Sequence, residues 1–460
     1  MSNFWDYNVW GGFNLFTILL LGLLAANMFK RTIPFLRNSL IPTSVLGGIL
    51  LLVVSAIYKG CTGNDFLEIA FFGGNGIANL EIITYHALAL GFIASYFKTS
   101  DDKLTKQRTV EIFNTGVTTV STYLLQAVAG FAITMIASAV IAGFFPAAGV
   151  LLPFGYGQGT GQALNYGTIY ETQYGFVGGK SFGLTIAAMG FLSASIGGVI
   201  HLMLLKRKGK VILHSDAEGA LSSEDVQGVG EIPMQGSVDK MTVQLAFVVA
   251  AYSLAYWLMN FLSTLLPGMR AVIFGFNFLL GVLTATLVKT VVSKLQQKGL
   301  IHRQYLNNFL MTRISNFFFD IMVVAGIAAI RLDMLEKYWG IMLILGVAGL
   351  FITYFYNLFV ARKLFPDYAE EQFLMMYGML TGTASTGVIL LREIDGDFKT
   401  PAADNMVYQN FPAIAFGFPM MLLATLAPEK PTLTMIILVL FFIAMNILLF
   451  RKHIFKTKAK

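Results

Sequence analysis

One segment in the first half of the chain alternates glycine with polar residues. Residues 151–171 read LLPFGYGQGTGQALNYGTIYE, with glycine at positions 155, 157, 159 and 161. Because each glycine inside a helix costs about 1 kcal/mol relative to alanine, this run predicts an interrupted helix. Backbone N–H groups at Gly159 and Gly161 could then approach a carboxylate. Gln158, Thr160 and Asn165 add neutral donors and oxygens, and Thr160 is a candidate ligand for Na⁺.

The same glycines allow a second interpretation, in which small residues let two helices pack closely. Gly155 and Gly159 have the GxxxG spacing of such contacts. Unwound backbone in a membrane is tolerated only where it is buried in protein or lines a watery cavity. Four alternating glycines with amide side chains between them therefore favour a binding site.

A second segment is rich in hydroxyl groups. Residues 375–395 read MMYGMLTGTASTGVILLREID, in which Thr381, Thr383, Ser385 and Thr386 lie between glycines. Hydroxyl and carbonyl oxygens can replace part of the hydration shell of an ion. Thr383, Ser385 and Thr386 are therefore predicted to bind Na⁺, or Na⁺ together with a substrate. Bonding of Ser and Thr to the preceding helical turn would explain one or two of these hydroxyls, but not four.

Two charged residues near apolar segments are further candidates. Asp320 lies inside the apolar stretch 306–330, where a carboxylate is costly, and it could hold Na⁺, accept a proton or meet a substrate ammonium. Pairing with Arg313 at the membrane edge is its alternative role. Arg392 could bind a substrate carboxylate through two parallel hydrogen bonds, or it could lie in the membrane interface. His86 and His201 lack partners at metal-ligand spacing and are predicted to be packed polar residues.

The rest of the chain consists mostly of long apolar segments. Hydrophobic residues make up 56% of the 460 residues and charged residues 12%. A membrane-spanning helix needs about 20 apolar residues, and continuous apolar runs argue against a transmembrane β-barrel. We expect an all-α integral membrane protein with about eleven spans, near 11–29, 39–58, 79–97, 116–141, 181–205, 241–266, 271–293, 306–330, 339–360, 406–427 and 433–450.

Basic residues orient these spans. Clusters at 30–37, 98–108, 206–210, 289–303, 362–363 and 451–460 fall on one side when eleven spans alternate. Lys and Arg favour the cytoplasmic side, so a multi-pass protein of the cell membrane is predicted, with its N-terminus outside and its C-terminus in the cytoplasm. Membrane orientation thus explains the net charge of +7 without nucleic-acid binding.

The order of the segments predicts a duplicated architecture. A polar connector at 206–240 separates a first repeat, 1–205, with five spans and the glycine-rich segment 146–168, from a second, 241–460, with the segment 371–392 and an extra C-terminal helix. An odd number of spans inverts the second copy. Inverted repeats with broken helices are a recurrent construction of secondary transporters, which hold substrate and coupling ion at the breaks. Both segments are therefore predicted to be re-entrant hairpins.

Several other function classes lack their sequence signals. No GxxxxGK[ST] loop for nucleotide-driven pumping is present. No nucleophile and base pair emerges, so an enzyme is not expected. Cys61 is the only cysteine, so a disulfide within the chain or a cysteine metal site is not expected either. The sequence predicts no cofactor beyond a coupling ion.

The two hairpin segments resemble the sodium:glutamate symporter family. The resemblance rests on GQGTG at 157–161, IPTSVLGGILLL at 41–52, YGF at 174–176 and the order of the spans. It implies sodium-coupled uptake of glutamate, two inverted five-helix repeats, and a homodimer in which one domain slides past a scaffold. Gln158 stands where the family tends to have His, and TASTG at 383–387 lacks the family's Pro. A sodium- or proton-coupled carrier of another di- or tricarboxylate is therefore the alternative.

Overall fold

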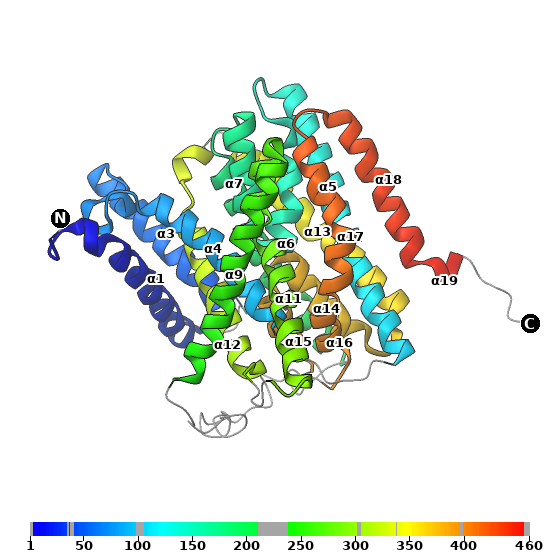
Figure 1. The fold of residues 1–460 in the computed structure, drawn as a ribbon. Coiled ribbons are helices and arrows are strands. Elements are labelled where there is room, and N and C mark those ends of the chain that lie inside the picture. The colour runs from blue at the N-terminus through cyan, green and yellow to red at the C-terminus, as the bar shows by residue number, and fades with distance from the viewer. Residues whose placement is uncertain are drawn as a thin grey trace, which may run out of the picture. The chain divides into compact units, whose positions relative to one another are not determined.

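The computed structural model describes residues 3–34, 36, 41–97, 105–209, 238–300, 305–336, 338–395 and 399–454. These residues form helices and connecting turns, and no β-strand occurs among them (Figure 1). Most of the predicted connector at 206–240 lies outside the described residues.

Ten of the described helices are long and apolar enough to cross a membrane. The all-α class and the multi-pass membrane character predicted from the sequence are therefore confirmed. These helices are α1 (Tyr7–Thr32), α3 (Thr43–Thr62), α4 (Gly76–Tyr96), α5 (Lys106–Val140), α7 (Gly179–Arg207), α9 (Lys240–Leu265), α11 (Asn277–Gln297), α12 (Asn308–Ala328), α13 (Trp339–Leu364) and α18 (Pro431–Leu449).

The remaining predicted span, 406–427, is divided between two shorter helices. These are α16 (Ala402–Tyr408) and α17 (Asn410–Leu426), and α17 contains Pro419. At 1.5 Å per residue, the 17 residues of α17 extend about 25 Å, less than the roughly 30 Å of a hydrocarbon core. The other α-helices described are α6 (Leu151–Tyr174), α10 (Arg270–Gly275), α14 (Ala369–Thr381), α15 (Ala384–Arg392) and α19 (Arg451–Ile454).

Side-chain caps define the start of two spans. The hydroxyl of Thr105 accepts a hydrogen bond from the Arg108 amide at 3.2 Å, and α5 begins at the next residue. The carboxylate of Asp239 accepts from the amides of Met241 and Thr242 at the start of α9. Such caps satisfy backbone donors that have no partner inside the helix.

The helices form two compact units. Unit 1 contains the start of α1, then α4, α9, α10, α11 and most of α12. Its core includes Ile93 of α4, Ala251 of α9, Ala285 of α11 and Ile314 of α12. Small and hydroxylated residues let the helices approach one another, as where the Thr284 hydroxyl donates to the Ala251 carbonyl at 2.8 Å.

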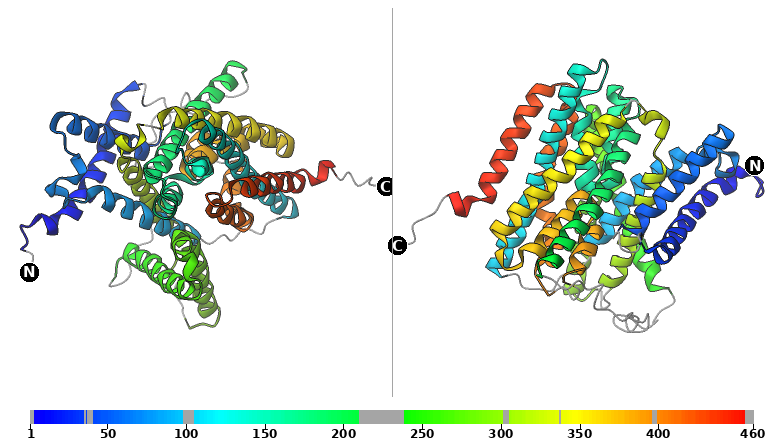
Figure 2. Two further views of the ribbon diagram at one scale, coloured as in Figure 1. Left: turned by 90° about the horizontal axis from the view of Figure 1, so that it is seen from above. Right: turned by 180° about the vertical axis from the view of Figure 1, so that it is seen from behind.

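Unit 2 contains α3, α5, α6, α7 and the helices from α13 to α19. Within it, α18 lies beside α5 and α17 (Figures 1 and 2). The unit takes α5, α6 and α7 from the first predicted repeat, and α13, α14, α15 and α17 from the second. The duplication and its inversion stay predictions, since packing units and repeats are different divisions of a chain.

Three tyrosines join α6 to α17 inside unit 2. Tyr166, Tyr170 and Tyr174 are four residues apart and therefore share one face of α6. Their hydroxyls donate to the carbonyls of Met421, Ala424 and Thr425 at 2.8, 2.7 and 3.1 Å. This row of hydrogen bonds fixes the second half of α6 along α17.

Candidate functional site

Helix α6 reverses direction at Gly159. The backbone of Gly159 has φ 80° and ψ −173°, a conformation open to glycine but strained for residues with a Cβ. The rings of Phe154 and Tyr166, on either side of the break, stack with centroids 3.8 Å apart. A straight helix would separate these two residues by about 18 Å. The segment from Leu151 to Tyr174 is therefore a pair of helices folded back on each other.

The second glycine-rich segment makes a similar reversal. Helix α14 ends at Thr381, Gly382 and Thr383 have non-helical backbones, and α15 begins at Ala384. A methyl group added at Gly378 would lie 2.8 Å from the Cα of Gly387. These two glycines would be about 14 Å apart along a straight helix. The glycines thus allow α15 to pack directly on α14.

Both reversals adjoin the same residue of α7. A methyl group added at Gly190 would lie 3.2 Å from the Cα of Tyr156, just before the first break, and would overlap the carbonyl oxygen of Thr381, at the second. The hydroxyls of Tyr156 and Tyr377 reach the next turn of α7, where Tyr156 bonds to Oγ of Ser193 at 2.9 Å and Tyr377 donates to its carbonyl at 2.8 Å. The absence of a side chain at Gly190 is what lets the two breaks approach α7 together.

Helix α5 supplies hydrogen-bond donors to both breaks. The Tyr123 hydroxyl donates to the Gly157 carbonyl at 3.0 Å, and the Gln126 amide donates to the Leu380 carbonyl at 2.9 Å. The same Gln126 nitrogen donates to the Thr353 hydroxyl of α13 at 2.8 Å. Carbonyls near a helix break lose their partners within the helix, and in an apolar interior they need others. Two residues about one turn apart on α5 thus support both reversals.

Unpartnered amide groups lie beside the first break. Gln162 is 1% exposed, and its Nε2 has no hydrogen-bond partner among the described residues, nor has Nε2 of the half-buried Gln158. Asn165 donates to Oε1 of Gln162 at 3.3 Å, which holds that end of the amide. A buried donor without a partner costs about 1–3 kcal/mol. A ligand with an acceptor group would remove this cost.

The hydroxyl groups predicted to bind an ion are placed at the two breaks. Thr160, adjacent to Gly159, and Thr386, in the first turn of α15, are both 0% exposed. The hydroxyls of Thr383 and Thr386 lie 3.4 Å apart. The side chain of Ser385 lies outside the part of the structure that is described. Sodium binding at these oxygens stays a prediction.

The two charged residues predicted to act at the site both have exposed side chains. Arg392 is the last residue of α15, about 14 Å along the chain from Thr383, and its side chain is exposed. Asp320 belongs to α12 in unit 1, and its side chain is also exposed. Among the described residues, no group of three or more His, Cys, Asp or Glu side chains could hold a metal ion.

Several residues of the site were not identified from the sequence. Tyr123 and Gln126 lie in an ordinary apolar span, and Thr353 and Gly190 lie in two others. Helix α5 did carry a signal, because its buried polar residues recur at helical spacing on one face, at Thr115, Thr118, Thr119, Thr122 and Gln126. A hydropathy count overlooks this pattern, since the span remains apolar on average.

An ionisable cluster lies at the other end of α14. Nε2 of His201 lies 2.8 Å from Oε2 of Glu370, and its Nδ1 lies 2.7 Å from the Tyr354 hydroxyl. Arg362 donates to the other oxygen of Glu370 at 3.2 Å. The hydrogen bond with His201, reinforced by Arg362, lowers the pKa of Glu370 to about 2. This cluster joins α7 and α13 to the start of α14, at the end of that helix opposite the second break.

Comparison with known proteins adds no assignment. Neither the models of known protein families nor the curated protein sequences yield a match to this chain. The resemblance to the sodium:glutamate symporters therefore stays a prediction, supported only by the motifs in the sequence.

Proposed function

We propose that this protein is a sodium-coupled secondary transporter of glutamate or a similar anionic amino acid. The observation that carries the proposal is the approach of two helix reversals to Gly190 within one compact unit. Broken helices of this kind are where secondary transporters hold substrate and coupling ion. The proposal includes two inverted repeats and two re-entrant hairpins, α6 and α14–α15.

In this proposal the first break binds the substrate carboxylate. Gln158 and Gln162 offer amide donors that lack partners among the described residues. The backbone N–H groups at Gly159 and Gly161 start a half-helix, whose positive end favours an anion. These donors are neutral, so the charge at the site comes from the ligand. An anionic substrate fits such a site better than a cation does.

Sodium is assigned to the oxygen atoms at the breaks. The ligands in this proposal are the hydroxyls of Thr160, Thr383 and Thr386, together with carbonyls freed by the reversals. Ser385 is a further candidate ligand there, and Asp320 of unit 1 stays a separate candidate for binding Na⁺. Sodium bound there would balance part of the substrate charge and order the site for it.

The two units supply the two domains that alternating access requires. We assign unit 2, which contains both breaks, to the moving domain of an elevator-type mechanism, and unit 1 to the scaffold of a homodimer. With α16 and α17 counted as the eleventh crossing, the N-terminus is outside the cell membrane and the C-terminus is in the cytoplasm.

The proposal is tested by uptake of radiolabelled L-glutamate into proteoliposomes with and without an inward Na⁺ gradient. We expect Na⁺-dependent uptake that Thr160→Ala abolishes. Thr168→Ala is the matched control, because the Thr168 hydroxyl only bonds back to the Leu164 carbonyl at 2.8 Å in the same helix. If di- or tricarboxylates but not glutamate are taken up, the substrate assignment is wrong. If no carboxylate is taken up under any Na⁺ or proton gradient, the transport proposal fails.

A further inference from the structure

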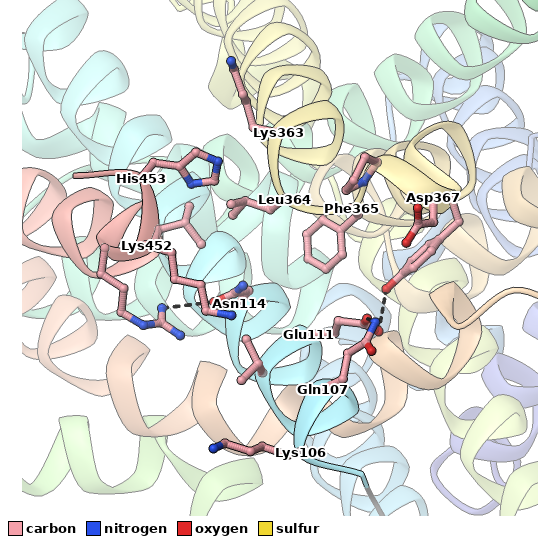
Figure 3. A pocket seen from close by; sticks show the side chains of 15 residues that line it. Lys106, Gln107, Glu111, Asn114, Lys363, Leu364, Phe365, Asp367, Lys452 and His453 are labelled. Atoms are coloured by element: carbon pink, nitrogen blue, oxygen red, sulfur yellow. Dashed lines mark hydrogen bonds between the residues drawn. The ribbon is translucent and has the colours of Figure 1, made fainter. Parts of the chain in front are cut away.

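A cavity of about 570 Å³ lies in unit 2 where three candidate spans end (Figure 3). Helix α5 begins there at Lys106, α13 ends at Leu364, and α18 ends at Leu449. The ends of membrane spans lie where hydrocarbon gives way to lipid headgroups and water. With these helices spanning a membrane, the cavity would lie at the level of the headgroups, away from the helix breaks.

Four cationic side chains line this cavity. Lys106, Lys363, Arg451 and Lys452 all line it, and none of the three lysines forms an ion pair within the described ranges. Lys452 lies with His453 across the cavity from the acidic residues (Figure 3). All three lysines are exposed. The cavity thus presents several cations to whatever enters it.

The negative charge in the lining is already partly balanced. Only Glu111 and Asp367 among the lining residues are acidic. Glu111 accepts a hydrogen bond from Arg108 at 2.6 Å and another from the Tyr368 hydroxyl at 2.9 Å. Because Arg108 lies outside the lining and balances Glu111, the cavity keeps an excess of positive charge.

Arg451 is held in place by residues of α5 and α18. Its Nη1 donates to Oδ1 of Asn114 at 3.1 Å and to the Leu448 carbonyl at 2.8 Å. Its guanidinium also lies 5.1 Å from the centre of the Phe113 ring. Both hydrogen bonds use Nη1, so the guanidinium keeps donors that suit the planar oxygens of a phosphate.

We propose that this cavity binds the phosphate of an anionic glycerophospholipid. Basic pockets between membrane helices on the cytoplasmic side suit acidic headgroups. Val110, Leu364, Phe365 and Leu449 also line the cavity. These apolar side chains would contact the glycerol and acyl region of the lipid. A free phosphate ion has no such apolar part. The lipid would join α18, the helix beyond the predicted repeat, to α5 and α13.

The test counts lipids bound to the purified full-length protein by native mass spectrometry. The protein is titrated with phosphatidylglycerol, phosphatidylcholine or inorganic phosphate. Removing a basic side chain near an anionic lipid surface weakens binding about fivefold. We therefore expect the double variant Lys106→Gln/Lys452→Gln to bind phosphatidylglycerol about 30-fold more weakly. Lys298→Gln, an exposed lysine at the end of α11, is the matched control.

Each outcome decides the proposal. One saturable phosphatidylglycerol site, retained in Lys298→Gln and Lys106→Arg/Lys452→Arg but weakened in the glutamine double variant, supports it. Equal binding of phosphatidylcholine overturns the requirement for an anionic lipid. Displacement of the lipid by millimolar inorganic phosphate would mean a free-anion site instead. Equal binding by the double variant and the unmodified protein would place the lipid elsewhere.

Discussion

Gly190→Ala tests whether the two helix breaks meet at α7. The added methyl group would overlap the Thr381 carbonyl oxygen and lie 3.2 Å from the Cα of Tyr156. Both are backbone atoms, so neither can rotate away, and such overpacking costs about 1–3 kcal/mol. Replacing glycine by alanine in a helix returns about 1 kcal/mol. We expect the free energy of unfolding to fall by up to about 2 kcal/mol. The rate of uptake should fall by more than the loss of folded protein explains, because the breaks are displaced.

The assay compares thermal unfolding in detergent with uptake in proteoliposomes. Gly12→Ala is the matched control, because Gly12 lies inside α1 and no atom comes within 4 Å of a methyl group added there. This control keeps the gain in helix propensity without the overlap, so its midpoint should stay the same or rise. A Gly190→Ala protein with both a normal midpoint and normal uptake would refute the convergence of the two breaks at this residue.

Three further changes test the supporting contacts. Gln126→Leu should lower stability by about 1–3 kcal/mol, because two buried acceptors lose their donor while the unpartnered Oε1 of Gln126 is removed, and an unchanged unfolding midpoint would contradict this. Tyr123→Phe should cost about 1 kcal/mol by removing the donor to the Gly157 carbonyl, and equal midpoints would argue against that bond. The lowered pKa of Glu370 means that ionised Glu370 stabilises the fold above about pH 4.5, and this contribution is lost as pH falls toward 2. The Glu370→Gln protein should therefore be less stable than the unmodified protein at neutral pH and should lose less stability on acidification. Unfolding followed by circular dichroism measures this, and parallel pH profiles of the two proteins would show that the bond with His201 adds no stability.

The spans could be predicted from sequence because hydropathy is a local property. Ten of the predicted spans correspond to helices long and apolar enough to cross a membrane. The segment 406–427 was harder, since its apolar composition does not reveal that α16 ends at Tyr408 or that α17 is short. The grouping into two units depends on contacts between distant segments, such as those between α4 and α11, which hydropathy does not encode.

The breaks could also be predicted, but their surroundings could not. Glycine at alternating positions indicated an interruption, and α6 reverses at Gly159 as that pattern required. Tyr123 and Gln126 support the breaks from spans whose overall composition is apolar. Their role depends on which carbonyls the folded chain brings to them. Exposed Arg392 shows the opposite case, a residue of suitable chemistry that the fold leaves away from the break.

Sodium-dependent L-glutamate uptake by Gln162→Glu proteoliposomes measures whether the substrate carboxylate binds at the first break. This near-isosteric change replaces the unpartnered amide donor with a carboxylate at the position proposed to meet the substrate carboxylate. Gln297→Glu, at the exposed end of α11, is the control for an added negative charge. We predict that Gln162→Glu loses uptake while Gln297→Glu keeps it. Normal uptake by Gln162→Glu would contradict a carboxylate site at this break.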